Sequence, residues 1–267
     1  MNHALSATLQ AVVAAVRLVA AEEIMPRYMK VAHQRKSDGS LCTEADLATQ
    51  EALTRKLQAI LDVPVIGEEM SEQQQVALWA DGLQTVWCID PIDGTSNFVH
   101  GLPYFAVSVA LIRGGKSVLG AVYDPVANEV FAAERGRGAF LNGAKLLGRT
   151  TAATLGIALA GVDMKRLDGK LAAALASSPP YCSQRNFGAS ALDWCYTAAG
   201  RYDVYLHGGQ KLWDYAAGSL VLLEAGGHMC GLDFDDFARE NVWQRSVIAA
   251  LDAKLFDEWK NWLRARQ

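Results

Sequence analysis

The stretch Val86-Trp87-Cys88-Ile89-Asp90-Pro91-Ile92-Asp93-Gly94-Thr95 decides the fold, because an apolar run in it ends on two aspartates and a glycine. A short apolar run bounded by polar residues is typical of a buried strand, which predicts a strand over residues 86–89. Pro91 fixes a turn after that strand. The carboxylates of Asp90 and Asp93 then converge with nearby backbone carbonyls, an arrangement of oxygens that suits Mg²⁺. The simpler alternative is an Asp-Pro turn followed by a glycine and an N-capping threonine.

Gly94 and Thr95 add a candidate anion site to this candidate cation site. Glycine lets the backbone N–H groups of residues 94 and 95 approach an anion closely. A short helix that begins here would also direct its positive end toward a phosphate.

Two helices are predicted before this stretch. The first covers residues 1–21 and the second covers residues 43–61, where Thr43 and Asp46 have the spacing of a capping box. Apolar residues that share one face of the first helix are Leu5, Leu9, Val12, Val13, Val16 and Ala20.

Apolar runs and turn residues outline the rest of the chain. They predict strands at 63–66, 105–112, 117–123 and 129–134, and a pair of short strands within 136–143. Beyond these, we expect strands at 157–160 and 204–206, and helices at 165–176, 190–200 and 215–225.

We expect a boundary near residue 145. Residues 1–145 would form an α+β half and residues 146–267 an alternating α/β half, with a ligand cleft between them.

Composition narrows the class of partner. The chain has 267 residues, is 51% hydrophobic and carries a formal net charge of −4, so it has no global basic field for a nucleic-acid backbone. Its five cysteines are scattered and contain no Cys-x-x-Cys pair, which favours a reducing cytoplasm. We expect neither a secretory signal nor a membrane-spanning segment.

Two further acidic positions are candidate ligands. Glu68 follows a predicted strand and a glycine, although adjacent acids such as Glu68 and Glu69 are usually part of a solvated loop. Asp214 opens an apolar helix, where a plain N-cap is the alternative. Asp46 is likewise accounted for locally by its capping box.

Several motifs together resemble the inositol monophosphatase family, within the superfamily of lithium-sensitive, magnesium-dependent phosphatases. They occur in the family's order over most of the chain: Lys36-Ser37-Asp38, Thr43-Glu44-Ala45-Asp46, Gly67-Glu68-Glu69, the residues 90–95, Gly138 to Gly143, and Trp213-Asp214-Tyr215-Ala216-Ala217-Gly218. The resemblance implies a layered α/β/α/β/α sandwich, usually a homodimer, and inhibition by Li⁺.

The resemblance also implies roles for the acidic residues. Glu68, Asp90 and the Ile92 carbonyl would hold one Mg²⁺, while Asp90, Asp93 and Asp214 would hold a second. A third, weaker site near Glu68 makes the count two or three ions. Asp46 and Thr95 would act together to take a proton from the attacking water.

Substrate contacts follow from the same resemblance. Asp93, Gly94 and Thr95 would contact the phosphate, while Arg185, Ser190 and His207 would face the leaving group. His207 departs from the pattern, because members that act on inositol phosphates often carry a carboxylate seven residues before the aspartate matching Asp214. Histidine accepts at most one hydrogen bond from a diol, so recognition must differ. Alternatively, His207 packs beside Gly208-Gly209 and touches nothing.

The sequence therefore predicts a cytoplasmic, Mg²⁺-dependent hydrolase of a small phosphorylated metabolite, with inositol monophosphate as the leading substrate. A 3'(2'),5'-bisphosphate nucleotidase, a histidinol-phosphate phosphatase or a fructose-1,6-bisphosphatase would use the same metal ligands. Some bacterial relatives also bind transcription machinery, so a role as an interaction module is the alternative from another class.

Overall fold

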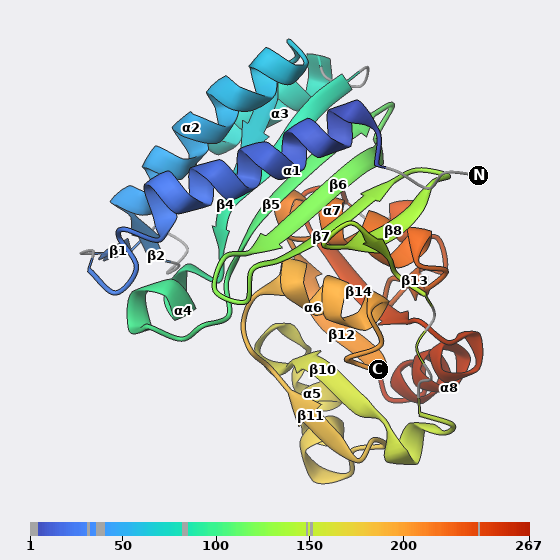
Figure 1. Cartoon of the computed structure of the whole chain (residues 1–267). Helices are drawn as coiled ribbons and strands as arrows, with labels where there is room; N and C mark the ends of the chain where they lie inside the picture. Colours follow the sequence, from blue (N-terminus) through green and yellow to red (C-terminus); the bar gives the residue numbers. More distant parts are fainter. Residues whose placement is uncertain are drawn as a thin grey trace.

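Two β-sheets form the framework of the computed structural model, which describes residues 5–30, 33–35, 41–81, 85–147, 149, 152–239 and 241–267 (Figure 1). The larger sheet has seven strands in the order β3 (Val65–Gly67), β4 (Thr85–Asp93), β5 (Ala106–Arg113), β6 (Lys116–Asp124), β7 (Glu129–Glu134), β8 (Gly138–Leu141) and β9 (Ala144–Lys145). The smaller has five in the order β11 (Ser183–Arg185), β10 (Leu159–Asp163), β12 (Val204–Gln210), β14 (Arg245–Ala250) and β13 (His228–Cys230). A further antiparallel pair joins β1 (His33–Arg35) to β2 (Leu41–Thr43).

Helices cover both faces of each sheet. On one face of the large sheet lie α1 (Ala7–Val19) and α2 (Glu44–Ile60), whose apolar stripes pack on Trp87 and Val109. On its other face, α6 (Ser190–Ala198) and α7 (Leu212–Glu224) lie between the two sheets. The outer face of the small sheet packs against α5 (Gly169–Ser177) and α8 (Ala253–Arg264). The expected α/β/α/β/α sandwich is therefore confirmed.

Two glycines allow α7 to pack closely between its neighbours. A Cβ on Gly218 would lie 2.5 Å from the Cβ of Trp194 on α6, and one on Gly120 would lie 2.9 Å from the Ala217 carbonyl oxygen. Both distances are shorter than a real Cβ contact, so these positions bring α6, α7 and β6 together. The close packing fixes the first turn of α7, which carries Asp214.

The remaining helices are short or lie at the edges of the fold. They are α3 (Glu72–Asp81), α4 (Thr95–His100), the π-helical turn η1 (Ala20–Ile24) that continues α1, and the 3₁₀ turns η2 (Leu155–Ile157), η3 (Met164–Arg166) and η4 (Phe237–Arg239).

Most predicted elements are present, with shifted ends. The hairpin of β5 and β6, strand β7 and the helices α2, α6 and α7 agree closely with the sequence prediction. The predicted helix over 165–176 is wrong at its start: η3 ends at Arg166, and α5 begins only after Asp168, whose side chain caps it. The predicted strand over 157–160 is displaced, because Ile157 belongs to a 3₁₀ turn and β10 continues to Asp163.

Strand β4 does not end at Ile89 as the sequence predicted. It continues through Pro91 to Asp93, and its pairing with β5 is irregular between residues 90 and 93. Proline is tolerated inside a strand at such an irregularity, because its missing N–H is not needed for the ladder there. The result is a bulged strand end that carries both aspartates.

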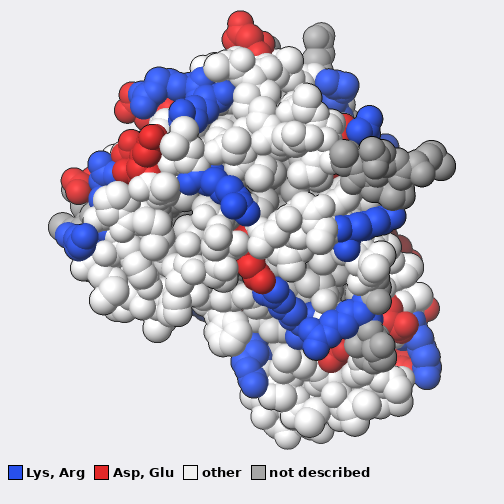
Figure 2. All heavy atoms as spheres, viewed as in Figure 1, with Lys and Arg blue, Asp and Glu red and all other residues white. Residues whose placement is uncertain are grey.

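Lysine and arginine side chains on the face in Figure 2 are interspersed with acidic and uncharged ones. Within the described residues, no helix combines the length and apolar character needed to cross a membrane. The division of the chain near residue 145 stays a prediction.

Candidate active site

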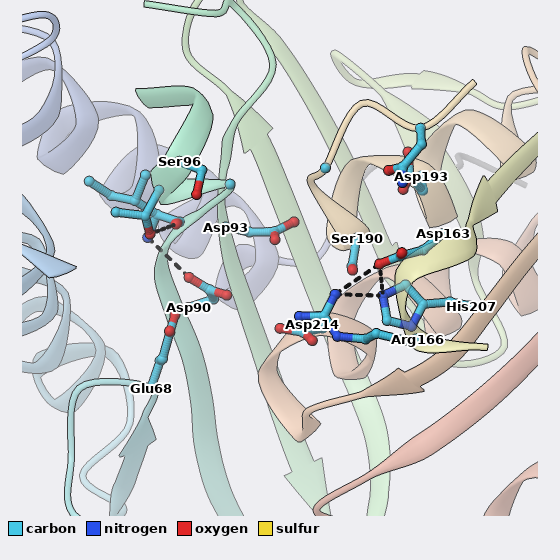
Figure 3. Close-up of a pocket in the computed structure, with 15 residues that line it drawn as sticks. Glu68, Asp90, Asp93, Ser96, Asp163, Arg166, Ser190, Asp193, His207 and Asp214 are labelled. Atoms are coloured by element: carbon cyan, nitrogen blue, oxygen red, sulfur yellow. Dashed lines mark hydrogen bonds and ion pairs between the residues drawn. The ribbon is translucent and has the colours of Figure 1, made fainter. Parts of the chain in front are cut away.

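A cleft of about 180 Å³ opens where the bulged end of β4 faces the smaller sheet (Figure 3). Nine of the residues singled out from the sequence line it: Glu68, Asp90, Ile92, Asp93, Gly94, Thr95, Ser190, His207 and Asp214. They come from the ends of β3 and β4, from the middle of β12 and from the starts of α4, α6 and α7. Residues far apart in the sequence therefore meet at one place.

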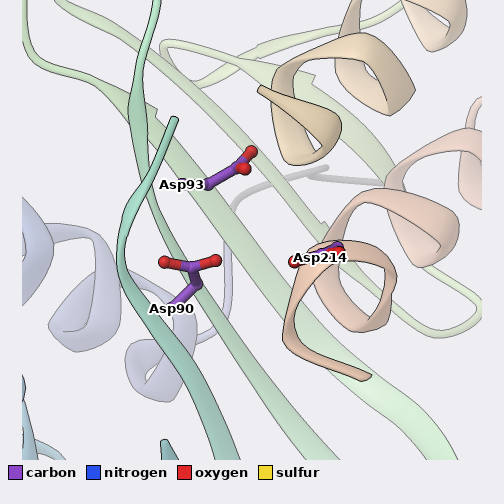
Figure 4. Close-up of side chains that lie close together, drawn as sticks. All are labelled: Asp90, Asp93 and Asp214. Atoms are coloured by element: carbon purple, nitrogen blue, oxygen red, sulfur yellow. The ribbon is translucent and has the colours of Figure 1, made fainter. Parts of the chain in front are cut away.

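Three carboxylates form the centre of the cleft. Asp90, Asp93 and Asp214 each place an oxygen within 4.8 Å of the others, and Figure 4 shows Asp214 facing the two aspartates of β4. Asp90 is only 1% exposed and Asp93 only 7% exposed. In the described part of the chain, no lysine or arginine forms an ion pair with any of the three.

Local hydrogen bonds orient these three side chains. Asp90 Oδ1 accepts the Ile92 N–H at 3.1 Å, and Asp93 Oδ2 accepts the Ala191 N–H at 2.6 Å. Asp214 Oδ2 accepts the Lys211 N–H at 2.9 Å, so Asp214 lies at the third position of α7 instead of at its N-cap. Each carboxylate keeps an oxygen available to a ligand.

Burial makes this cluster of acids unfavourable when ionised. It raises the pKa of Asp90 and of Asp93 well above the ordinary value, and neighbouring carboxylates raise both further. The pKa of Asp214 rises to about 7, again mainly through burial. Glu68, which also lines the cleft, is among the carboxylates that raise the pKa of Asp90. A divalent cation would relieve this repulsion, so the donor set fits a hard metal ion.

Asp46 lies beside the cleft and uses its two oxygens for different partners. Oδ2 accepts the Thr43 N–H at 2.7 Å, which confirms the capping box of α2. Oδ1 accepts from the Thr95 hydroxyl at 3.3 Å. Burial raises the pKa of Asp46 to about 6. The capping interpretation and the pairing with Thr95 therefore hold together.

Gly94 has the backbone conformation expected at the start of a helix in a confined space. Its φ is +90°, and it precedes α4 as the N-cap. A Cβ at Gly94 would lie 3.1 Å from both the Ala189 Cβ and the Tyr104 carbonyl oxygen. Residues that carry a side chain rarely adopt this φ, so the position favours glycine.

His207 lines the cleft and is almost fully buried, with 2% exposure. Its Nε2 lies 3.1 Å from Asp163 Oδ2, and its Nδ1 accepts the Gly209 N–H at 3.1 Å. The alternative that His207 touches nothing is therefore wrong.

Other sequence candidates lie elsewhere. Arg185 is exposed on β11, where its Nη1 donates to Ser183 Oγ at 2.9 Å and to the Gln184 carbonyl at 2.7 Å, and it does not line the cleft. The motif Lys36-Ser37-Asp38 lies outside the described residues.

Three charged residues of the cleft were not anticipated. Asp163 and Arg166 lie at the end of β10 and in the following 3₁₀ turn, beyond the strand that the sequence predicted. Asp193 on α6 accepts from the Tyr104 hydroxyl at 2.8 Å, and burial raises its pKa to about 8. Asp168, a favourable N-cap residue, followed by Gly169, a poor residue for a helix interior, was the signal that the helix begins after Asp168 and that residues 164–168 connect it to β10.

Comparison with solved structures identifies the class of fold. The fold is that of an extragenic suppressor protein suhB from Bartonella henselae, with a TM-score of 0.83 and 28% identity over 97% of this chain and 99% of that one. An IMPase from Thermotoga maritima has a TM-score of 0.79 and 28% identity, covering 96% and 97% of the two chains.

Sequence comparison gives the family. The model of the inositol monophosphatase family matches residues 4–262. A Nus factor SuhB of Pasteurella multocida (strain Pm70) is 40% identical over 73% of each chain, and an inositol-1-monophosphatase of Mesorhizobium japonicum is 34% identical over 82% of this chain and 86% of that one. The chain belongs to the inositol monophosphatase family.

Proposed function

We propose that this protein is a Mg²⁺-dependent phosphomonoester hydrolase with an inositol-1-monophosphatase-like reaction. The observation that carries the proposal is the meeting of Asp90, Asp93 and Asp214 within 4.8 Å of one another in a cleft. Clustered carboxylates are costly unless a cation neutralises them. The start of α4 beside them supplies backbone N–H groups suited to a phosphate.

The residues that would hold the cations are Glu68, Asp90, Asp93, Asp214 and the Ile92 carbonyl, with two or three Mg²⁺ per site. When bound, Mg²⁺ would neutralise charge on the phosphate oxygens, make an attacking water more acidic and stabilise the departing alkoxide.

The chain's own groups would position the substrate and move a proton. Gly94 and Thr95 would bind the phosphate through their N–H groups, while Ser190 borders the leaving group. The Thr95 hydroxyl has one proton and two acceptors, the Ile92 carbonyl at 3.0 Å and Asp46 Oδ1 at 3.3 Å. In the proposed relay it gives that proton to Asp46 Oδ1 while its own lone pair accepts one from water. Because the pKa of Asp46 is about 6, the carboxylate is ionised at neutral pH and can act as a general base.

Replacing Thr95 by Val is expected to lower kcat by roughly 10²-fold to 10⁴-fold, because the proton relay to Asp46 is lost. Initial rates of phosphate release at saturating Mg²⁺ measure the effect. Thr54→Val on the same helix as Asp46 is the matched control, since the Thr54 hydroxyl donates only to the Gln50 carbonyl among the described residues. A Thr95→Val rate within twofold of the control would exclude the relay.

The substrate is tested with a panel of phosphomonoesters. Inositol monophosphate, 3'-phosphoadenosine 5'-phosphate, histidinol phosphate, fructose-1,6-bisphosphate and glycerol 2-phosphate are incubated with Mg²⁺ and with chelator. Chelator-sensitive release from inositol monophosphate supports the leading substrate, and preferred release from another compound replaces it. No release from any of them contradicts the proposed activity.

A second candidate function rests on the names of relatives. The 40% identical relative from Pasteurella multocida is called a Nus factor SuhB, which favours an added role in binding transcription machinery. The test is whether an Asp93→Asn variant that has lost turnover keeps the biological effect of the gene. Loss of the effect together with turnover would remove this candidate.

A further inference from the structure

The side of the cleft opposite Asp90 and Asp93 carries a second group of charged residues, which lies beside Asp214. Asp163 at the end of β10 and His207 on β12 are direct neighbours in the parallel pairing of the two strands. Arg166 follows on the 3₁₀ turn, and its Nη1 donates to Asp163 Oδ2 at 2.8 Å. Figure 3 shows these three side chains together at the cleft, across from Asp90 and Asp93.

Both ring nitrogens of His207 already form hydrogen bonds within the protein. Nδ1 accepts the Gly209 N–H, so the ring proton must be on Nε2, which donates to Asp163 Oδ2. Arg166 Nη1 lies 3.5 Å from the same Nε2, but both atoms are donors and do not bond to one another. His207 is therefore a neutral positioning residue for Asp163 and offers nothing to a substrate hydroxyl.

Both carboxylate oxygens of Asp163 likewise accept hydrogen bonds within the protein. Its Oδ2 accepts from both His207 and Arg166, and its Oδ1 accepts the Lys165 N–H at 2.9 Å. The carboxylate therefore serves to hold the arginine.

Arg166 keeps donors for a ligand. Within the described residues Asp163 is the one acceptor of its guanidinium, through Nη1, which leaves Nε and Nη2 available. Its side chain is 53% exposed while that of Asp163 is only 13% exposed, so the arginine is the member of the pair that faces solvent in the cleft.

The backbone under Arg166 is also fixed. A Cβ at Gly208 would lie 1.8 Å from the Arg166 carbonyl oxygen, so only a glycine lets the turn approach β12 so closely. The ion pair with Asp163 and the close backbone contact with Gly208 together hold the Arg166 guanidinium at the edge of the cleft. A positioned guanidinium with free donors is suited to a carboxylate or a phosphate.

We propose that Arg166 binds a second anionic group of the substrate, so that the preferred phosphomonoester carries a carboxylate or a further phosphate on its alcohol part. This inference rests on the proposed hydrolase function and specifies its substrate class. A neutral polyol would meet the Arg166 guanidinium at this position, because the Asp163 carboxylate already accepts hydrogen bonds within the protein.

Two matched pairs of substrates test the preference and distinguish the two anions. Glycerol 2-phosphate and 2-phosphoglycerate differ only by a hydroxymethyl group and a carboxylate. Glucose 1-phosphate and glucose 1,6-bisphosphate differ by a phosphate. We expect kcat/KM to be roughly tenfold or more higher for the anionic member of at least one pair, the size of a charge-assisted hydrogen bond.

Replacing Arg166 by Gln should remove that preference. The expected change is a roughly tenfold or larger rise in KM for the anionic substrate with little change in kcat, because the contact is present before and during the reaction. The readout is the ratio of kcat/KM between the two members of each pair. Arg166→Lys should restore part of the preference.

Arg137→Gln is the matched control. Arg137 is 57% exposed and pairs with Glu134 three residues earlier, which reproduces the exposure and spacing of Arg166 and Asp163 away from the cleft. Equal kcat/KM within both pairs, or a preference unchanged in Arg166→Gln, would overturn the inference while leaving the hydrolase function standing. If no monoester is hydrolysed, the function fails, and calorimetric binding of the same pairs decides the inference: equal affinity or no binding overturns it.

Discussion

An Asp214→Asn variant is expected to lose Mg²⁺-dependent phosphate release by roughly 10³-fold or more, and Asp90→Asn by a similar factor. Each substitution removes one negative charge from a cluster in which three carboxylates lie within 4.8 Å of one another. Asparagine keeps the side-chain oxygen that caps α7 at Lys211, so the fold should be retained. The loss is measured as initial rates over a Mg²⁺ titration.

The matched control for these variants is Asp124→Asn. Asp124 is also buried, with 1% exposure, but it lies at the end of β6, where its Oδ1 accepts the N–H groups of Val126 and Ala127. Its rate should equal that of the wild type, while circular dichroism should show all the variants folded. A wild-type rate in folded Asp214→Asn or Asp90→Asn would contradict the proposed metal site.

Local signals were enough to predict much of this site. The apolar run before Asp90, the glycine before Thr95 and the spacing of Thr43 and Asp46 each encode a strand end or a helix start within a few residues. The bulge at Pro91 was less accessible, because whether a proline ends a strand or is tolerated in it depends on the pairing with β5.

Other features depend on contacts between distant segments. Nothing local indicates that Asp163 and His207 become neighbours, because their pairing is set by the parallel register of β10 and β12. Arg166 was placed inside a predicted helix, and only the packing of its carbonyl against Gly208 fixes it as a turn residue at the cleft. Arg185 shows the converse: a motif match suggested a substrate contact, but the residue is exposed on an edge strand.

The departure at His207 is easier to understand with these neighbours. A carboxylate is still present on this side of the cleft, but on the adjacent strand as Asp163, where it holds Arg166 instead of remaining free. The histidine and the arginine thus belong to one arrangement. Under the proposed function, the change at position 207 would affect recognition of the leaving group more than the reaction itself.

Removing divalent cations should make the protein less stable as the pH rises, which is the second large effect that we expect. Burial raises the pKa of Asp90 and of Asp93 well above the ordinary value and that of Asp214 to about 7. In the unfolded chain, aspartates titrate near 3.9. The folded state therefore binds more protons between these values, and its stability falls as the pH rises from about 4 through about 7 and above.

Groups with lowered pKa values act in the opposite direction, and Asp163 and His207 are the two of them at the cleft. The pKa of Asp163 is lowered by His207 and Arg166 against the effect of burial, so its contribution is lost only below about pH 4. Burial lowers the pKa of His207, which favours folding as the pH rises near 6.5. Against this one histidine stand the three clustered aspartates, and also Asp46 and Asp193, whose pKa values burial raises to about 6 and about 8. The net change from pH 5 to pH 8 therefore remains destabilising.

Thermal unfolding in EDTA should therefore give a melting temperature about 5–10 °C lower at pH 8 than at pH 5, since each kcal/mol corresponds to roughly 2–4 °C for a chain of this size. Saturating Mg²⁺ should abolish the decline, because bound cations stabilise the ionised carboxylates. Asp214→Asn, which lacks one of the titrating groups, should melt higher than the wild type at pH 8 in EDTA and gain less from Mg²⁺. A melting temperature that is constant or rises from pH 5 to pH 8 in EDTA would show that the three aspartates are not held as a strained, cation-dependent cluster.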